Sequence, residues 1–459
     1  MGLNEHNNFD VIIIGGGPAG ASAGIHLKKA GLSIAIFEKE TFPRPHVGES
    51  LVPFCYELFE DLGVLDTLIK TTVRKPGVRF TNSSGSSSTT YYFNNVLKGP
   101  NQLSFHVLRE KFDKQLLDKA KELGVEVFEN HKVTNIDLTN PSKAFVTCEN
   151  NGKKKQTEAS FLIDATGQDT FLANKMRTKS KHKELQRTAF LRHWDCQTNR
   201  EDFKEGVLQI LYLDGHKKGW IGIQPVDENR VSLGLIINND YLKSNREKYK
   251  SDNWKEEFYE EEILLSPFIK KILDGAKPVN DLLVVGDYSY TVDQKFGHNY
   301  ALVGDSAGFL DPIFATGVYL ALNSSKITSS AIITYLTKDK KTGLEELQNA
   351  YSQYKGAFNL VEKFIYNFYD PSFINLAEIG KEVSSKDKSY TKHLIAFSML
   401  HFLMGGDFFN EHKKYSEFIE FLKEPKQLAR YLHMVIENPA NKSSGKRYTI
   451  DEIYPMLKS

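Results

Sequence analysis

The 459-residue sequence has few cysteines: only Cys55, Cys148 and Cys196, which lie far apart. No CxxC pair occurs, which argues against a disulfide framework and against a cysteine-ligated zinc site. We therefore expect three reduced thiols, no bound metal and a cytoplasmic protein.

Long hydrophobic runs and an excess of one charge are also absent. The longest apolar stretch, residues 395–404, has about half the length that a membrane span needs, so a buried helix is expected there. The polar residues 1–10 lead us to expect no signal peptide. The net charge is +1, from 59 basic and 58 acidic residues, which argues against nucleic acid or an anionic membrane as the partner.

A glycine-rich turn follows the first apolar run. Residues 9–14, FDVIII, have the pattern of a strand buried in a parallel sheet, and GGGPAG follows directly. Gly15 allows a tight turn, Gly17 lets the backbone approach a pyrophosphate, and Gly20 lets the next helix pack on the strand. Glu38 ends the second expected strand, where it can accept hydrogen bonds from ribose hydroxyls. Together these features predict a dinucleotide site with its phosphates at the helix start.

The order of patterns predicts that this nucleotide domain is interrupted by a second one. Parallel-strand signals recur at residues 159–167 and 300–312, whereas residues 78–105 and about 185–285 alternate apolar and polar side chains as in an antiparallel sheet. We expect an α/β fold. Its parts are a discontinuous Rossmann-type nucleotide domain (residues 1–80, 106–180 and 286–335), an inserted β-sheet substrate domain (residues 81–105 and 181–285) and a helical C-terminal region (residues 336–459).

Three further motifs favour FAD, because they resemble those of the FAD-dependent monooxygenase superfamily. LVGDSAGFLDP at residues 302–312 resembles the second flavin motif, which implies that Asp305 binds the ribityl chain. VLREKFDKQLLDKA resembles the R-x-x-FD-x-x-L helix, which implies that Arg109 lies near the diphosphate or ribityl segment; IDATG at residues 163–167 is similarly typical. Taken singly, Asp305 would also suit a helix cap and Arg109 a surface ion pair. The resemblance implies an FAD-binding domain like those of glutathione reductase and p-hydroxybenzoate hydroxylase.

A third set of motifs resembles the flavin-dependent halogenases, most closely the branch that acts on phenol- or pyrrole-like substrates, often bound to a carrier protein. These motifs are FPRPHVGESLVP (42–53), VRKPGVRF (73–80), DYSY (287–290) and GDSAGFLDPIFATGVYLAL (304–322). The resemblance covers about residues 9–330 and weakens in the tail.

The resemblance implies roles for the matching residues. The expected cofactor site consists of Gly15, Gly17, Ala19, Gly20, Glu38, Arg44, Gly48, Glu49, Ser50, Arg109, Asp305, Pro312 and Gly317. Backbone N–H groups of Thr316 and Gly317 would bind halide, since amides at a turn entering a helix form an anion-binding concavity. Lys75 occupies the position of the family's essential lysine, which would hydrogen-bond hypohalous acid or form a haloamine; a solvated surface lysine is the alternative.

One motif departs from the family pattern. Where halogenases usually carry WxWxIP, residues 219–225 read GWIGIQP, so Gly222 replaces the second tryptophan and Gln224 the isoleucine. The usual motif is thought to keep the substrate away from the flavin. This departure leaves open an FAD monooxygenase that hydroxylates or epoxidises its substrate directly. A geranylgeranyl-reductase-like enzyme and a flavin-binding scaffold without activity are further alternatives.

The expected function is halogenation of a phenol- or pyrrole-like aromatic substrate, free or carrier-bound, with reduced FAD, oxygen and chloride or bromide. No second GxGxxG with a matching strand is found to hold a nicotinamide cofactor. Reduced FAD is therefore expected from a separate flavin reductase.

Overall fold

The computed structural model describes residues 8–370 apart from 96, 98, 103 and 198–200, together with residues 375–377, 408–422, 424–431 and 455. The apolar stretch at 395–404, expected to be a buried helix, lies outside these residues. Among the helices described, none has the length and apolar character needed to cross a membrane. In the same residues no group of three or more His, Cys, Asp or Glu side chains suits a metal ion.

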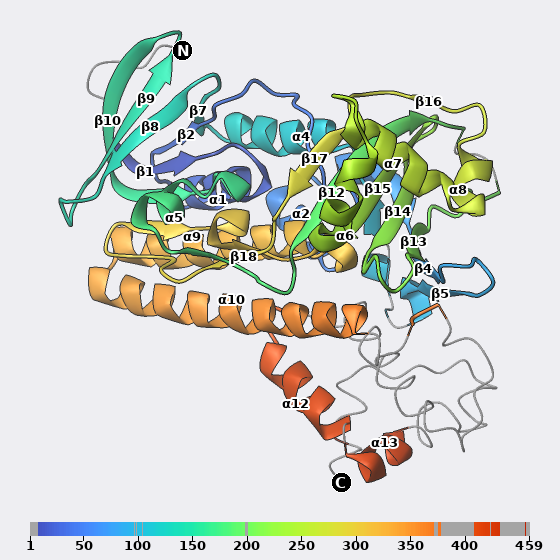
Figure 1. Cartoon of the computed structure of the whole chain (residues 1–459). Coiled ribbons are helices and arrows are strands. Elements are labelled where there is room, and N and C mark those ends of the chain that lie inside the picture. Colours follow the sequence, from blue (N-terminus) through green and yellow to red (C-terminus); the bar gives the residue numbers. More distant parts are fainter. Residues whose placement is uncertain are drawn as a thin grey trace.

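A mixed sheet with parallel central strands forms the first part of the fold (Figure 1). In spatial order its strands are β7 (Glu126–Phe128), β2 (Ile34–Phe37), β1 (Asn8–Ile14), β10 (Lys153–Asp164), β9 (Ala144–Asn150) and β8 (Lys132–Asp137), and β19 (Tyr300–Leu302) also pairs with β10. β1 is parallel to both β2 and β10. Its apolar run is buried, as expected for the centre of a parallel sheet.

Four helices pack on this sheet and on one another. They are α1 (Pro18–Lys29), α4 (Arg109–Glu122), α9 (Gly317–Thr337) and α10 (Lys340–Tyr369). α1 packs between α4 and α9, and α10 runs beside α9 (Figure 1). Small residues permit the close approach of α1 and α9. Gly304, in the turn after β19, lies between the two helices, and a Cβ there would lie 2.9 Å from the Ala19 Cβ on α1 and 3.2 Å from the Ala321 Cβ on α9. The Ser325 hydroxyl on α9 donates to the Ala19 carbonyl at 2.8 Å.

The second sheet is mainly antiparallel. Its order is β16 (Lys277–Pro278), β12 (Arg187–Asp195), β15 (Arg230–Asn238), β14 (Trp220–Asp227), β13 (Leu208–Tyr212), β4 (Gly77–Thr81) and β5 (Ser88–Tyr92), and β17 (Leu283–Gly286) also pairs with β12. Only β4 and β13 form a parallel pair. Residues 77–80 therefore belong to this sheet, because β4 continues it beyond β13. We expected them in the first segment of the nucleotide domain, residues 1–80.

The two faces of the second sheet differ. Phe190, Ile221 and Leu235 point toward helices α7 (Trp254–Leu264) and α8 (Pro267–Ile272), where they form a separate apolar core. The alternate residues of the same strands, such as Ala189 and Gly222, line a cavity on the other face. Side chains alternate between the two faces with period 2, so one set of strands both builds a core and walls a cavity.

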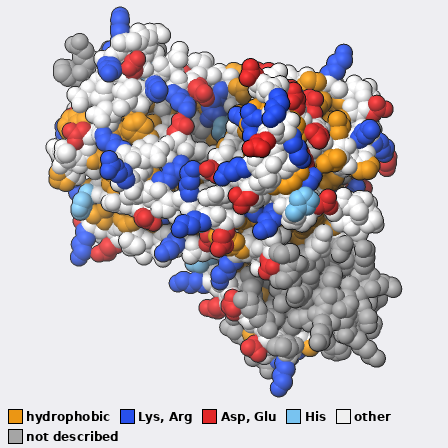
Figure 2. Space-filling model, viewed as in Figure 1, with side chains coloured by type: hydrophobic (Ala, Val, Ile, Leu, Met, Phe, Trp, Pro, Cys, Tyr) orange, Lys and Arg blue, Asp and Glu red, His pale blue; other side chains and the backbone are white. Residues whose placement is uncertain are grey.

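Short elements connect these layers. They are α2 (Cys55–Leu62), α3 (Leu65–Thr71), α5 (Phe171–Met176), α6 (Asn239–Asn245), the pair β3 (Val73–Lys75) and β6 (Ser104–His106), and the small sheet of β11 (Lys179–Lys181), β18 (Tyr290–Val292) and β20 (Gly308–Phe309). α12 (His412–Leu422) and α13 (Pro425–Tyr431) follow α10 in the region where helices were expected. On the face seen in Figure 2, lysine and arginine side chains are interspersed with aspartate and glutamate, in keeping with the balanced net charge.

We predict that Gly20→Ala destabilises the protein, because a Cβ at Gly20 would lie 1.9 Å from the Gly15 carbonyl oxygen. α1 would have to move away from the β1 turn, at a cost of about 1–3 kcal/mol in the free energy of unfolding. Urea unfolding followed by circular dichroism measures this cost. Gly215→Ala is the control, since a Cβ there meets nothing within 4 Å. Equal stability of the two variants would contradict the packing role of Gly20.

Candidate active site

A cavity of about 570 Å³ begins at the turn between β1 and α1, where Gly15, Gly17 and Ala19 form part of its wall. Gly15 has a φ of 101°, and a Cβ there would lie 2.4 Å from the Ala165 carbonyl oxygen, so glycine is required. α1 begins after Gly17 with no acidic residue in its first turn. Its unpaired N–H groups and positive dipole end are therefore available to an anion. Gly20 does not line the cavity and acts through packing.

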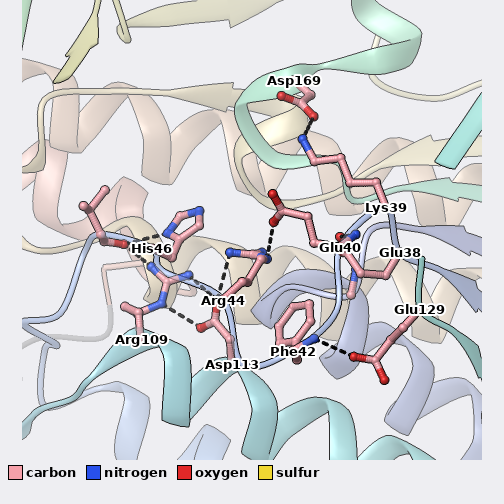
Figure 3. A network of polar contacts seen from close by, with 12 residues as sticks. Glu38, Lys39, Glu40, Phe42, Arg44, His46, Arg109, Asp113, Glu129 and Asp169 are labelled. Atoms are coloured by element: carbon pink, nitrogen blue, oxygen red, sulfur yellow. Dashed lines mark hydrogen bonds and ion pairs between the residues drawn. The ribbon is translucent and has the colours of Figure 1, made fainter. Parts of the chain in front are cut away.

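Glu38 directly follows β2 and lies at the rim of the same glycine-rich turn. One carboxylate oxygen accepts from the Gly16 N–H at 2.7 Å and the other from the Glu40 N–H at 2.9 Å. Lys39, which also lines the cavity, forms an ion pair of 2.5 Å with Asp169 across it (Figure 3). The sequence placed Glu38 here, but it contained no signal for the Lys39–Asp169 pair.

Arg109 and Arg44 converge on the buried carboxylate of Asp113 (Figure 3). Arg109 donates to both Asp113 oxygens, at 2.7 and 2.9 Å, and its remaining nitrogen donates to the Val47 carbonyl. Arg44 lies 3.8 Å from Asp113 and 3.1 Å from Glu40. Because Arg109 is buried, the surface ion pair considered for it is wrong. The two arginines tie the loop that contains the GES sequence to α4.

Asp305 lies in the turn after β19 and faces the cavity. Burial raises its pKa to about 7, although the nearby Arg109 charge partly opposes this. His46, on the opposite loop, has a pKa lowered to about 4 by the Arg109 charge and by burial, so its ring is neutral at pH 7. The Asp305 carboxyl group therefore exists in both its protonated and its ionised form near neutral pH. A hydroxyl group that donates a hydrogen bond to it would stabilise the ionised form.

A second helix start opens on the cavity. Pro312, Thr316 and Gly317 line it, and the 21-residue helix α9 begins at Gly317. Ala315 has a φ of 56°, in the left-handed region. The chain turns at this residue, and the first backbone amides of α9 then lie at the cavity wall. Two positive helix ends, those of α1 and α9, therefore meet at one cavity.

The second sheet closes the cavity on its far side. Gly222 and Gly234 are direct cross-strand partners and both line the wall. A Cβ at Gly222 would lie 2.9 Å from the Trp220 ring, and one at Gly234 would lie 2.8 Å from a Leu191 methyl group. The Trp220 ring and the Leu191 side chain therefore occupy the space that side chains at these two positions would fill.

The polar network behind this wall was not foreseen. Tyr369, the last residue of α10, donates to Asp311 at 2.8 Å and accepts from the Trp220 indole N–H at 2.9 Å. Tyr288 also donates to Asp311, at 3.1 Å, and the Arg187 guanidinium lies 3.4 Å over the Tyr369 ring. Because Asp311 also accepts from the Ile313 N–H, the network joins α10 to the turn before α9.

The GES turn contributes Gly48, Glu49 and Ser50 to the wall, as expected. The buried Glu49 carboxylate lies 2.8 Å from the His193 ring on β12, a partner that the sequence did not suggest. This contact joins the nucleotide-binding part of the chain to the second sheet.

Lys75 does not line the cavity. Its ammonium or amine group is buried and donates to the Leu51 carbonyl at 2.7 Å, and the Phe93 ring lies 5.6 Å away. Burial lowers its pKa to about 7. The alternative of a solvated surface lysine is therefore wrong, since only 1% of Lys75 is exposed.

The chain is similar to known proteins in sequence and in fold. Residues 8–354 match the model of the FAD-binding domain family. The chain is 28% identical to the 1H-pyrrole-2-carbonyl-[peptidyl-carrier protein] chlorinase of Pseudomonas fluorescens, covering 82% of this chain and 84% of that one. It is 30% identical to the corresponding brominase of Pseudoalteromonas luteoviolacea, covering 72% and 78%. The solved flavin-dependent brominase Bmp2 superposes with a TM-score of 0.72 at 26% identity, covering 88% and 94%.

The chain belongs to the flavin-dependent halogenase family. It is an FAD-dependent enzyme, and the residues of its cavity fit the cofactor. The α1 start offers amides to a diphosphate, Glu38 offers acceptors at the end of β2, and Asp305 offers a carboxylate between the two helix starts.

We predict that this halogenase-family enzyme binds FAD more tightly as pH rises through about 7, because the ionised Asp305 carboxylate accepts hydroxyl hydrogen bonds. Asp305→Asn should flatten this dependence and weaken FAD binding about tenfold. Fluorescence titration with FAD between pH 5 and 9 measures both effects. Wild-type affinity that does not change with pH would contradict the role of Asp305.

Asp305 should also affect the stability of the cofactor-free protein. Between about pH 4 and 7 the folded chain retains a proton that the unfolded chain has released, so stability falls as pH rises through this range. Asp305→Asn removes this loss. At pH 8 the variant without FAD should therefore unfold at a higher urea concentration than the wild type.

We predict that Tyr369→Phe lowers the free energy of unfolding by about 1–3 kcal/mol, because Trp220 loses its acceptor and Asp311 one of its donors. Urea unfolding of the two proteins measures the difference. Tyr366→Phe, on the same helix, is the control, since the Tyr366 hydroxyl makes no hydrogen bond within the described residues. A loss of stability as large in the control would contradict the role of the network.

Proposed function

We propose that this protein halogenates a phenol- or pyrrole-like aromatic ring, using reduced FAD, oxygen, and chloride or bromide. The observation that carries the proposal is the pairing of one flavin-sized cavity at two helix starts with a buried lysine directly behind its GES turn. The names of two relatives support a pyrrole group on a carrier protein as the substrate.

Bound reduced FAD would supply the two electrons with which oxygen converts halide into hypohalous acid. The surrounding residues would bind and orient the reactants. The first N–H groups of α9, at Thr316 and Gly317, would hold the halide ion. The Arg44, Gly48, Glu49 and Ser50 segment would lie along the ribityl chain and ring system, and Pro312 would lie against the ring face.

Lys75 would then direct the halogen. Its pKa of about 7 leaves a large fraction as the neutral amine at physiological pH, and only that form has a lone pair for the halogen. A lysine of ordinary pKa would be almost entirely protonated. Burial thus makes a reactive amine from a common side chain.

The second sheet would be the substrate domain, with its cavity wall of Trp220, Gly222 and Leu191 receiving the aromatic ring. Reduced FAD would come from a separate flavin reductase, because the sequence has no second GxGxxG motif for a nicotinamide cofactor.

The function is tested by incubating the protein with reduced FAD, oxygen and bromide, together with a phenol or a pyrrole-2-carboxamide. Mass spectra of the product should show the two-isotope pattern of bromine. Oxygen insertion with bromide ignored would overturn the proposal, and product formed without oxygen would indicate a reductase.

A direct monooxygenase is the second candidate function, and Gly222, which stands where halogenases usually carry a second tryptophan, favours it. Without a second indole, a substrate ring could lie nearer to the flavin. The same incubation in ¹⁸O₂ distinguishes the two functions, since only a monooxygenase transfers the label to the product.

We predict that Lys75→Met abolishes bromination, by at least about a hundredfold, while FAD still binds and reduced FAD is still oxidised by oxygen. Wild-type bromination should rise with pH through about 7, because the neutral amine is the reacting form. Product formation by Lys75→Met at the wild-type rate would contradict the role of Lys75.

Lys75→Met should also be more stable than the wild type at pH 7. Above about pH 7 the folded chain lacks a proton that the unfolded lysine still binds, so at neutral pH the buried amine lowers the free energy of unfolding. If Lys75→Met is more stable than the wild type but no longer brominates, Lys75 serves the reaction and not the stability of the fold.

A further inference from the structure

Lys75 lies on one edge of a small three-stranded unit, and the opposite edge of that unit, at Ser50, lines the flavin cavity. β6 pairs with β3 on one side, and on the other side Ser50 and His106 form an antiparallel bridge. Ser50 lines the cavity, whereas Lys75 does not. Any halogen carrier formed in the cavity must therefore pass this unit to reach the amine.

The pairing register places four polar side chains on one face of the unit. Lys75 lies opposite Ser104, and His106 lies two residues along β6 from Ser104, so these three share a face. Ser50 joins them through its bridge to His106. Lys75 reaches across β6 on this face, because its nitrogen donates to the carbonyl of Leu51 on the far strand.

Ser50 and His106 approach each other closely. The Leu51 N–H donates to the Phe105 carbonyl and the Val107 N–H to the Glu49 carbonyl, which makes the Ser50–His106 pair a non-hydrogen-bonded one. Side chains are nearest to each other in pairs of this type. The cavity wall at Ser50 is therefore continuous with His106 and, beyond it, with Ser104 and Lys75.

Three of these side chains have a buried polar atom that no described residue satisfies: the hydroxyl oxygens of Ser50 and Ser104 and the Nδ1 atom of His106. An unsatisfied buried polar group costs about 1–3 kcal/mol. Three on one small face indicate that a polar molecule occupies the space between them.

His106 supplies a fixed hydrogen-bond acceptor. Its Nε2 atom lies 2.9 Å from the Gly206 carbonyl, which can only accept, so Nε2 carries the ring proton and Nδ1 keeps its lone pair. Burial, and then the charge of Lys75, lower the pKa of His106 to about 3. The ring therefore remains neutral and keeps this acceptor at working pH.

We propose that Ser50, Ser104 and His106 bind a small neutral hydroxylic molecule, with its O–H on His106 Nδ1. The molecule is water at rest and hypohalous acid during turnover, and this second part rests on the proposed function. Held there, hypohalous acid presents its halogen to Lys75. The N–X bond forms as the O–X bond breaks, and one amine proton and the hydroxide leave as water.

The test compares Ser104→Ala and His106→Gln with the wild type. The glutamine amide can still donate to Gly206 at the position of Nε2, but it offers no acceptor at Nδ1. Ser329→Ala is the matched control, since Ser329 is another buried hydroxyl without a partner among the described residues and lies in α9. Each protein receives bromide, reduced FAD, oxygen and phenol, with monochlorodimedone in solution to capture escaped hypobromous acid.

Both site variants should oxidise reduced FAD at the wild-type rate, while bromophenol per FAD falls about tenfold and bromination of the scavenger rises correspondingly. The control should match the wild type. Bromophenol yields within twofold of the wild type in both site variants would overturn the proposal. If the wild type brominated neither phenol nor scavenger, the proposed function would fail and hypohalous acid would no longer be the ligand.

A crystal structure of the FAD-loaded wild type tests the site independently of turnover. We expect an ordered water within hydrogen-bond distance of His106 Nδ1 and the Ser104 hydroxyl, absent or displaced in His106→Gln. If no water lies within hydrogen-bond distance of His106 Nδ1 in the wild type, the proposed binding site is wrong, whatever reaction the enzyme performs.

Discussion

The site depends on the close approach of helices α1 and α9. Ala19, Gly304 and Ala321 leave so little side chain between them that a Cβ on Gly304 would lie within 3.2 Å of both alanine methyl groups. This packing brings two positive helix ends to one cavity, which suits a cofactor that carries two phosphates and an anionic co-substrate. A larger residue at any of the three positions would separate the ends and divide the cavity.

Around that pair of helix ends, the protein keeps ionisable groups where they reduce stability. Asp305 and Lys75 are both buried, one with a raised pKa and the other with a lowered one, and neither makes an ion pair in the described part of the chain. Arg109 and Asp113, by contrast, are buried but satisfy each other through two hydrogen bonds. Arg109 and Asp113 thus form a structural pair, whereas Asp305 and Lys75 are buried ionisable groups that have no ion pair among the described residues and to which chemistry is assigned.

Much of this site was predictable because its motifs are contiguous. Gly15, Gly17 and Glu38 act within one β-α-β unit, so a short stretch of chain determines their geometry. The contacts that sequence reasoning missed join distant segments: Tyr369 meets Trp220 across 149 positions and His193 meets Glu49 across 144. The domain boundary expected at residue 80 cut through strand β4, although the alternation from residue 78 favoured the second sheet, and the pairing with β13 shows that the whole strand belongs there. Such pairings depend on tertiary packing, which local patterns do not encode.

The position of Lys75 bears on which chemistry Gly222 allows. A missing second tryptophan would let an aromatic ring approach the flavin, yet the reactive amine lies outside the flavin cavity, where it donates to the Leu51 carbonyl directly after the GES turn. Ser50 lines the cavity and pairs with His106, so these two residues stand between the flavin and the amine. Under this arrangement the residues around Gly222 determine which ring fits the cavity, and the strand unit determines that a halogen carrier, not the flavin's own oxygen, reaches Lys75.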